Sequence, residues 1–145
     1  MAEADWLPLH CAFRVALEVS ERVIIGNVNA YREAIVHLKV RGPEGSEQGV
    51  AAIVDTGFNG WLTLPSPLIT TLNLPFRGRG AGTMADGSEA LFDIHEATVV
   101  WDGQPRLVPV YAVESEPLLG MDFFYGDELT IQVVEGGSVA IKKLS

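Results

Sequence analysis

The sequence predicts an all-β domain, a closed antiparallel β-barrel or sandwich that carries one short helix. Three observations support this fold class. Apolar and polar residues alternate with a period of two, which is the pattern of half-buried strands. Hairpin dipeptides separate these alternating runs. The chain has 145 residues, a usual size for one domain, so we interpret residues 1–145 as a single domain with no room for a second lobe.

Predicted strands account for most of the chain. Two long alternating runs cover residues 13–19 and 34–40, and an apolar run at residues 50–54 predicts a short strand buried on both faces. Five further strands are expected at residues 61–64, 94–101, 106–113, 129–134 and 139–142. The dipeptides Asp86-Gly87, Asp102-Gly103 and Gly136-Gly137 predict tight turns between strands.

Two shorter segments differ from this pattern. Residues 67–72 predict the one helix, because Ser66 is a suitable N-cap and Pro67 suits the first helical position. Residues 78–82 read Gly-Arg-Gly-Ala-Gly. They do not lie between a strand and a helix, as a nucleotide-binding loop would, so we interpret them as a flexible hinge.

The charge balance disfavours two classes of partner. The chain has 10 Lys and Arg against 19 Asp and Glu, a formal net charge of −9, which disfavours nucleic acids and anionic membrane surfaces. The first residues are acidic, unlike a secretory signal. Residues 56–76 carry no charge, but three prolines make them unsuited to span a bilayer. We therefore expect a cytoplasmic protein with no membrane partner.

No cofactor or metal is expected from the residue pattern. Cys11 is the single cysteine, so neither an internal disulfide nor a thiolate metal cluster can form. The histidines His10, His37 and His95 are widely separated and make no metal-ligand pair of close spacing. Phosphate-binding loops and serine nucleophile elbows are also missing from the sequence.

One constellation does indicate chemistry. The apolar residues 50–54 are followed directly by Asp55, Thr56 and Gly57. The simpler interpretation is an Asx turn at a strand end, with Asp55 accepting backbone N–H bonds and Gly57 taking a positive φ. The context favours a functional interpretation, because a second apolar strand follows, and Leu118, Leu119 and Gly120 occur roughly 60 residues later.

Together these segments resemble the retropepsin-like aspartic proteases, and most closely their single-domain bacterial members. The resemblance extends roughly over residues 39–144. It implies that Asp55 is the catalytic carboxylate, that the Thr56 hydroxyl locks two copies together, and that Gly57 admits close backbone approach. It further implies a flap that contacts substrate and a loop that supports Asp55. The flap residues are Met84, Ala85, Asp86 and Gly87, and the supporting loop is Leu118, Leu119 and Gly120.

The resemblance also implies the reaction and the assembly. Hydrolysis by carboxylates requires one group that activates water and one that donates a proton. The chain has a single Asp-Thr-Gly motif, so one chain supplies half of the pair. We therefore expect a two-fold symmetric homodimer that cleaves peptide or protein substrates as an aspartic endopeptidase. Residues 139–144 would contribute to the dimer sheet.

Two features depart from the family pattern. Phe58 follows Gly57, where the retroviral enzymes usually carry Ala or Ser, and its bulk is expected to alter the floor of the site. Residues 1–28 extend beyond the minimal core, as an edge strand, a cover for the dimer interface or a cleaved leader. Two alternatives to a protease stay open: a non-catalytic peptide-binding or interaction module on the same fold, and an unrelated β domain in which Asp55 is only a turn residue.

Overall fold

The computed structural model describes residues 23–145, which form ten strands and two short helices. The strands are β1 Val23–Val28, β2 Ala34–Arg41, β3 Glu47–Val54, β4 Leu62–Leu64, β5 Phe76–Thr83, β6 Glu89–Trp101, β7 Gln104–Ala112, β8 Leu118–Leu119, β9 Asp127–Ile131 and β10 Ser138–Lys143. The helices are α2 Ser66–Thr71 and α3 Met121–Phe124. The strand predicted at residues 13–19 lies outside the described residues.

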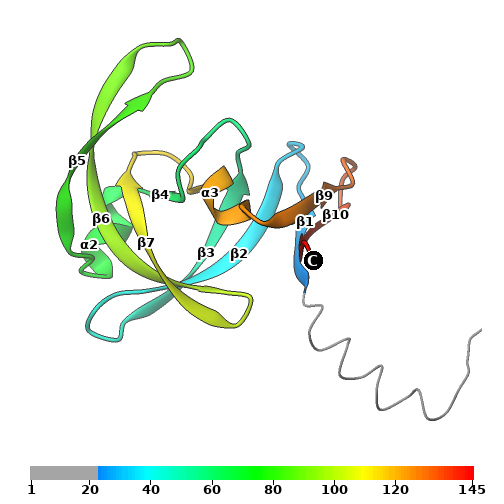
Figure 1. The fold of residues 1–145 in the computed structure, drawn as a ribbon, viewed down its shortest axis with the longest axis horizontal. Helices are drawn as coiled ribbons and strands as arrows, with labels where there is room; N and C mark the ends of the chain where they lie inside the picture. The colour runs from blue at the N-terminus through cyan, green and yellow to red at the C-terminus, as the bar shows by residue number, and fades with distance from the viewer. Residues whose placement is uncertain (1–22) are drawn as a thin grey trace, which may run out of the picture.

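All ten strands belong to one sheet, in the order β5-β6-β7-β4-β8-β3-β2-β1-β10-β9. An additional pairing of β2 with β6 folds the sheet back on itself (Figure 1). Most pairs are antiparallel, but β3 with β8 and β4 with β7 run parallel. The all-β class is therefore confirmed, whereas the closed barrel stays a prediction. No helix in residues 23–145 is long and apolar enough to cross a membrane.

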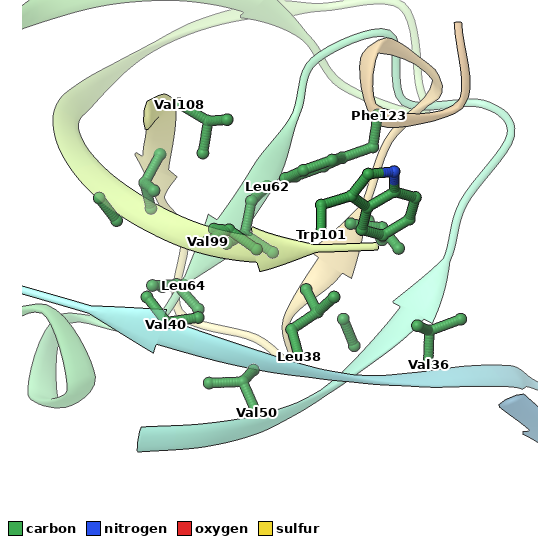
Figure 2. Packing of buried hydrophobic residues seen from close by; sticks show 14 of the residues in the cluster. Val36, Leu38, Val40, Val50, Leu62, Leu64, Val99, Trp101, Val108 and Phe123 are labelled. Carbon is green, nitrogen blue, oxygen red and sulfur yellow. The ribbon is translucent and has the colours of Figure 1, made fainter. Parts of the chain in front are cut away.

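The core lies where the sheet folds over. Alternation along β2 buries Val36, Leu38 and Val40 almost completely, as its period-two pattern predicts. Figure 2 shows these side chains beneath Trp101 of β6 and Phe123 of α3. The rings of Trp101 and Phe123 have centroids 4.9 Å apart. This packing holds α3, and the segment that precedes it, against the sheet.

Turn chemistry sets the register of the β6–β7 hairpin. Trp101 pairs with Gln104, so Asp102 and Gly103 form a two-residue turn. Both have positive φ values, 53° and 75°, which is the conformation that Asp-Gly pairs favour in such turns. The predicted hairpin is confirmed here.

Glycines at residues 78–82 are part of a strand, so the predicted hinge is wrong. Gly80 and Gly82 lie in β5, paired with β6 in register. A Cβ at Gly80 would lie 2.6 Å from the Ile94 side chain, and one at Gly82 would lie 2.8 Å from the Phe92 ring. The alternate glycines therefore make room for large side chains of β6, which cover them. Glycines at every second position are compatible with a strand, although glycine is more often taken as a sign of a turn or a hinge.

Smaller differences concern element boundaries. The structure has a second helix, α3, because the apolar residues after Gly120 turn inward to bury Phe123 and Phe124. Strand β9 ends at Ile131, short of the predicted residue 134, and Val133 and Val134 are each 64% exposed. Helix α2 begins after Pro65 as N-cap, one residue before the predicted Ser66.

Strand β3 is also less buried than its apolar sequence predicts. Val50 and Ala52 are buried, but Gly49 and Ala51 are exposed. The predicted strand at residues 50–54, buried on both faces, is therefore wrong in its burial. Small apolar residues such as Ala51 tolerate exposure at low cost, so composition alone overestimates burial.

Candidate active site

Asp55 follows the last residue of β3, at the start of a loop that runs to β4. Its backbone N–H donates to the Leu119 carbonyl at 2.9 Å, so it continues the pairing of β3 with β8. Its carboxylate Oδ1 accepts the Gly57 N–H at 2.9 Å, and its carbonyl accepts the Phe58 N–H at 3.1 Å. The side chain is thus held in one orientation, half-buried, at the end of the strand.

This geometry includes the Asx turn of the simpler interpretation, but with one difference. The φ of Gly57 is not positive, so a turn requirement does not explain the glycine. A Cβ at Gly57 would lie 3.3 Å from Asp55 Oδ1, closer than most Cβ contacts. Glycine therefore suits a position directly beside the carboxylate. Thr56 and Gly57 are both exposed, and their proposed roles stay predictions.

The short strand β8 braces this loop from both sides. It pairs in parallel with β3 at Ile53 and Val54, and antiparallel with β4 at Leu62. The Leu118 N–H donates to the buried Thr63 hydroxyl at 2.9 Å. Leu119 is fully buried. The structure thus brings the predicted supporting residues into direct contact with the segment that carries Asp55.

Gly120 permits the closest approach in this region. Its N–H donates to the Trp61 carbonyl at 2.9 Å, and the next two residues donate to Phe58 and Gly60 at 2.8 and 3.1 Å. A Cβ at Gly120 would lie 2.1 Å from the Gly60 carbonyl oxygen. That contact is with backbone, which cannot rotate away. Only glycine therefore fits at this position without displacing the loop.

Phe58 fills the space above these glycines. Its ring lies where a Cβ on Gly60 or Gly120 would project, at 2.6 Å from either. The ring also meets Tyr111 of β7 edge-on, with centroids 6.0 Å apart. Tyr111 in turn packs on Phe92 of β6, at 5.9 Å. The departure at Phe58 is therefore accommodated by an aromatic chain that links the Asp55 loop to the β5–β6 hairpin.

Tyr111 and Phe92 are neighbours of the site that the sequence pattern does not indicate. Both are half-buried: Phe92 lies between exposed residues of β6, and Tyr111 follows the buried Val110 in β7. The one indication in the sequence is Phe58, directly after the Asp-Thr-Gly motif, because a large ring beside the site must pack against other large side chains. Nothing in the spacing along the chain identifies which strands supply that partner, because the pairing is long-range.

The predicted flap residues form the tip of the β5–β6 hairpin. The Met84 N–H donates to the Ser88 carbonyl at 2.7 Å, and the Gly87 N–H donates back to the Met84 carbonyl at 2.9 Å. Gly87 has a φ of 88°. All of the tip residues are exposed, and the hairpin arches away from the rest of the sheet (Figure 1). The hairpin is present as predicted, and its role as a flap stays a prediction.

The Asp86 carboxylate at the hairpin tip accepts its hydrogen bonds from within the same turn. The Ser88 hydroxyl donates to Asp86 Oδ1 at 2.6 Å, and the Ser88 N–H donates to the same oxygen at 2.9 Å. These two hydrogen bonds lower the pKa of Asp86 from its ordinary value of 3.8. Within residues 23–145, no three His, Cys, Asp or Glu side chains are grouped so that they could hold a metal ion.

Comparison with a solved structure shows that the fold is of the retropepsin-like type. A crystal structure of a retropepsin-like aspartic protease from Rickettsia conorii matches 86% of this chain and 95% of its own, with a TM-score of 0.52 and 14% identity. At that identity the likeness shows the fold alone. No protein-family model and no curated protein matches the chain.

Proposed function

We propose that the protein is an aspartic endopeptidase with one catalytic Asp in each subunit of a homodimer. The observation that carries the proposal is Asp55 itself: a strand-ending carboxylate on a loop locked by backbone hydrogen bonds to residues 119–122. A carboxylate that hydrogen bonds hold in one orientation, beside the exposed Thr56 and Gly57, suits proton transfer to a bound reactant. The retropepsin-like fold supports the same assignment by analogy, since fold alone does not fix function.

The chemistry requires a second carboxylate. In the proposed reaction, one ionised Asp55 takes a proton from water as the water attacks the peptide carbonyl. The other Asp55, protonated, donates to the carbonyl oxygen, which gives a tetrahedral diol. A proton then passes from the carboxyl pair to the amide nitrogen, the C–N bond breaks, and the amine and the carboxylic acid leave. Two carboxylates about 3 Å apart share one proton because both cannot ionise easily. A single chain presents one Asp-Thr-Gly motif, so the partner copy supplies the second group across a two-fold axis.

The assembled site would take an extended peptide between the two Asp55 loops and the two hairpins. In this proposal Thr56 contacts its symmetry mate, residues 84–87 cover the substrate, and residues 139–144 join the dimer sheet. We further propose that the protein acts on peptides or proteins in the cytoplasm, without a cofactor.

The test is Asp55→Asn, which keeps the shape of the side chain and removes the ionisable proton. Cleavage of a peptide library or of denatured casein should fall by at least about 10²-fold, with the thermal unfolding midpoint unchanged. The matched control is Glu44→Gln, which neutralises an exposed carboxylate in the β2–β3 turn and should retain full activity. Equal turnover by the Asp55→Asn protein refutes the mechanism.

The dimer has its own measurement. Sedimentation equilibrium should give twice the chain mass of 15.7 kDa under the conditions of cleavage. A strictly monomeric protein that cleaves peptides would contradict the shared site. Peptide binding without cleavage by the unmutated dimer would instead favour the non-catalytic binding module.

A further inference from the structure

The first half of β3 has an edge that no strand within residues 23–145 covers. The N–H groups of Ile53 and Asp55 donate to the carbonyls of Pro117 and Leu119, each at 2.9 Å, so these two residues direct their backbone groups away from β2. Backbone direction alternates along a strand, and the β2–β3 register is regular. Gly49 and Ala51 therefore direct their N–H and C=O groups to the same edge as Ile53.

No described strand pairs with that edge at Gly49 or Ala51. Strand β8 pairs with β3 only at Ile53 and Val54. The reason lies in Pro117, the residue before β8, which has no N–H to offer the Ala51 carbonyl. The pairing therefore stops there, and within residues 23–145 the edge groups of Gly49 and Ala51 have no backbone partner among the described strands.

A groove of about 430 Å³ lies along this open edge. Its floor is residues 48–51 of β3. Its opposite wall comes from α2 and the residues before it, and its end from the segment that leads into β8. The wall and end residues are Pro65, Pro67, Leu68, Thr71, Glu116 and Pro117.

The wall of the groove is fixed at both ends of α2. At the start, the Ser66 N–H donates to Glu114 Oε2 at 3.1 Å, and the Ser66 hydroxyl donates to the same oxygen. At the end, the Ser46 hydroxyl donates to the Leu72 carbonyl at 3.4 Å. The helix is thus tied both to the β7–β8 connection and to the β2–β3 turn, so an occupant would meet a groove that is already formed.

We propose that this groove binds an extended segment of a partner polypeptide, which adds to β3 as a further strand beside Gly49 and Ala51. Open edges in soluble proteins are usually blunted by charges, prolines or bulges. Here the edge carries a glycine and an alanine in regular register, and a Cβ on Gly49 would meet nothing within 4 Å. Four backbone groups in a row without a partner strand in residues 23–145 match an extended backbone and no compact ligand.

The shape and charge of the groove define the chemistry of the segment. Helix α2 stands beside the edge, so a flexible single segment fits there better than the edge of a folded sheet. The proline and leucine wall favours apolar side chains. Glu116 is the one charged residue in the lining, and it has no ion-pair partner among residues 23–145. The segment is therefore basic as well as apolar. This inference does not depend on the proposed peptidase reaction.

The test uses the Asp55→Asn protein, so that cleavage cannot interfere, and a synthetic probe peptide of sequence Val-Lys-Val-Lys-Val with blocked ends. Two further peptides carry N-methyl groups on alternate residues, in the two possible phases. Because the N–H groups of a strand point alternately to its two edges, one of these peptides carries its methyl groups on the edge that would pair with β3. The other carries them on the opposite edge, where they do not prevent pairing. One methylated peptide should retain affinity and the other should lose about tenfold or more.

The site of binding is read from backbone amide NMR of the full chain. The probe should shift the Gly49 and Ala51 resonances and slow hydrogen exchange at their amides. Glu116→Gln should weaken the lysine-containing probe severalfold, whereas Glu44→Gln, in the exposed turn, should not. Equal binding of both methylated peptides, shifts confined to other residues, or no binding at millimolar peptide would each overturn the proposal.

Discussion

Two turns carry the predicted catalytic and flap residues, and they are built in opposite ways. The loop that begins at Asp55 is held by backbone hydrogen bonds to residues 119–122, roughly 60 residues further along the chain. Among residues 23–145, the hairpin tip at residues 84–88 is held only by hydrogen bonds within itself. A loop that is hydrogen-bonded to residues far along the chain keeps one geometry. A turn that is bonded only within itself, at the end of two long strands, can move as a unit. In the proposed peptidase, this difference would match the separate demands of positioning a carboxylate and admitting a substrate.

Gly120→Ala should have the largest effect on stability, because it disrupts the close packing of Gly120 against the Asp55 loop at Gly60. The added methyl group would lie 2.1 Å from the Gly60 carbonyl oxygen, and backbone can only shift, not rotate. We expect a loss of about 3 kcal/mol in the free energy of unfolding, from overpacking. Urea denaturation followed by tryptophan fluorescence measures it.

The control for this change is Gly49→Ala. A Cβ there meets nothing within 4 Å, so the unfolding free energy should change by less than about 0.5 kcal/mol. If the two variants are equally stable, the close approach of Gly120 to Gly60 does not hold the loop.

Thr63→Val should have an intermediate effect on the same loop. Valine keeps the volume of the buried threonine but cannot accept the Leu118 N–H bond, leaving that donor unsatisfied. The expected cost is about 1–2 kcal/mol of unfolding free energy. Thr71→Val removes an exposed hydroxyl that donates to the Pro67 carbonyl, and should cost much less. Similar losses in both variants would show that the buried Thr63 bond contributes no more to stability than the exposed Thr71 bond.

Asp86 should give the smallest effect, confined to the hairpin tip. Its pKa is lowered by bonds from Ser88, so the turn gains stability that is full above the ordinary value of 3.8. That stability is lost as the pH falls through the lowered pKa, because the protonated carboxyl accepts these bonds less well. Carboxyl-carbon NMR should show the Asp86 pKa rising back toward 3.8 in Ser88→Ala.

Asp127 serves as the reference in that titration. Burial raises its pKa, with Arg106 and Lys143 opposing the rise, and none of these contacts involves the hairpin tip. Its titration should be the same in both proteins. A Ser88→Ala spectrum in which the Asp86 pKa is unchanged would mean that the Ser88 hydroxyl does not donate to Asp86 in solution.

Much of the fold was predictable because its signals are local. The alternation along β2, and the Asp102-Gly103 turn that pairs Trp101 with Gln104, depend on residues close in sequence. The candidate site was partly predictable for a different reason, since Asp55 and Leu118–Leu119 belong to recognisable motifs.

The remaining features of the fold and of the site depend on contacts between segments far apart in the sequence, which no local pattern indicates. Strand β5 was missed because its glycines make sense only opposite Phe92 and Ile94 of the neighbouring strand. The aromatic chain from Phe58 through Tyr111 was missed because three separate segments meet there. The open edge of β3 was hidden by an apolar sequence that predicts burial on both faces.

The two-residue strand β8 has a consequence for how the protein is made. During synthesis, β3 leaves the ribosome long before residues 118–122 exist, and the Asp55 loop has nothing to bond to until they appear. Contacts this distant in sequence form late and slowly. A nascent chain that stops before Gly120 should therefore carry the whole Asp-Thr-Gly motif and still lack an ordered carboxylate, which would delay the proposed hydrolytic activity until residues 118–122 have emerged.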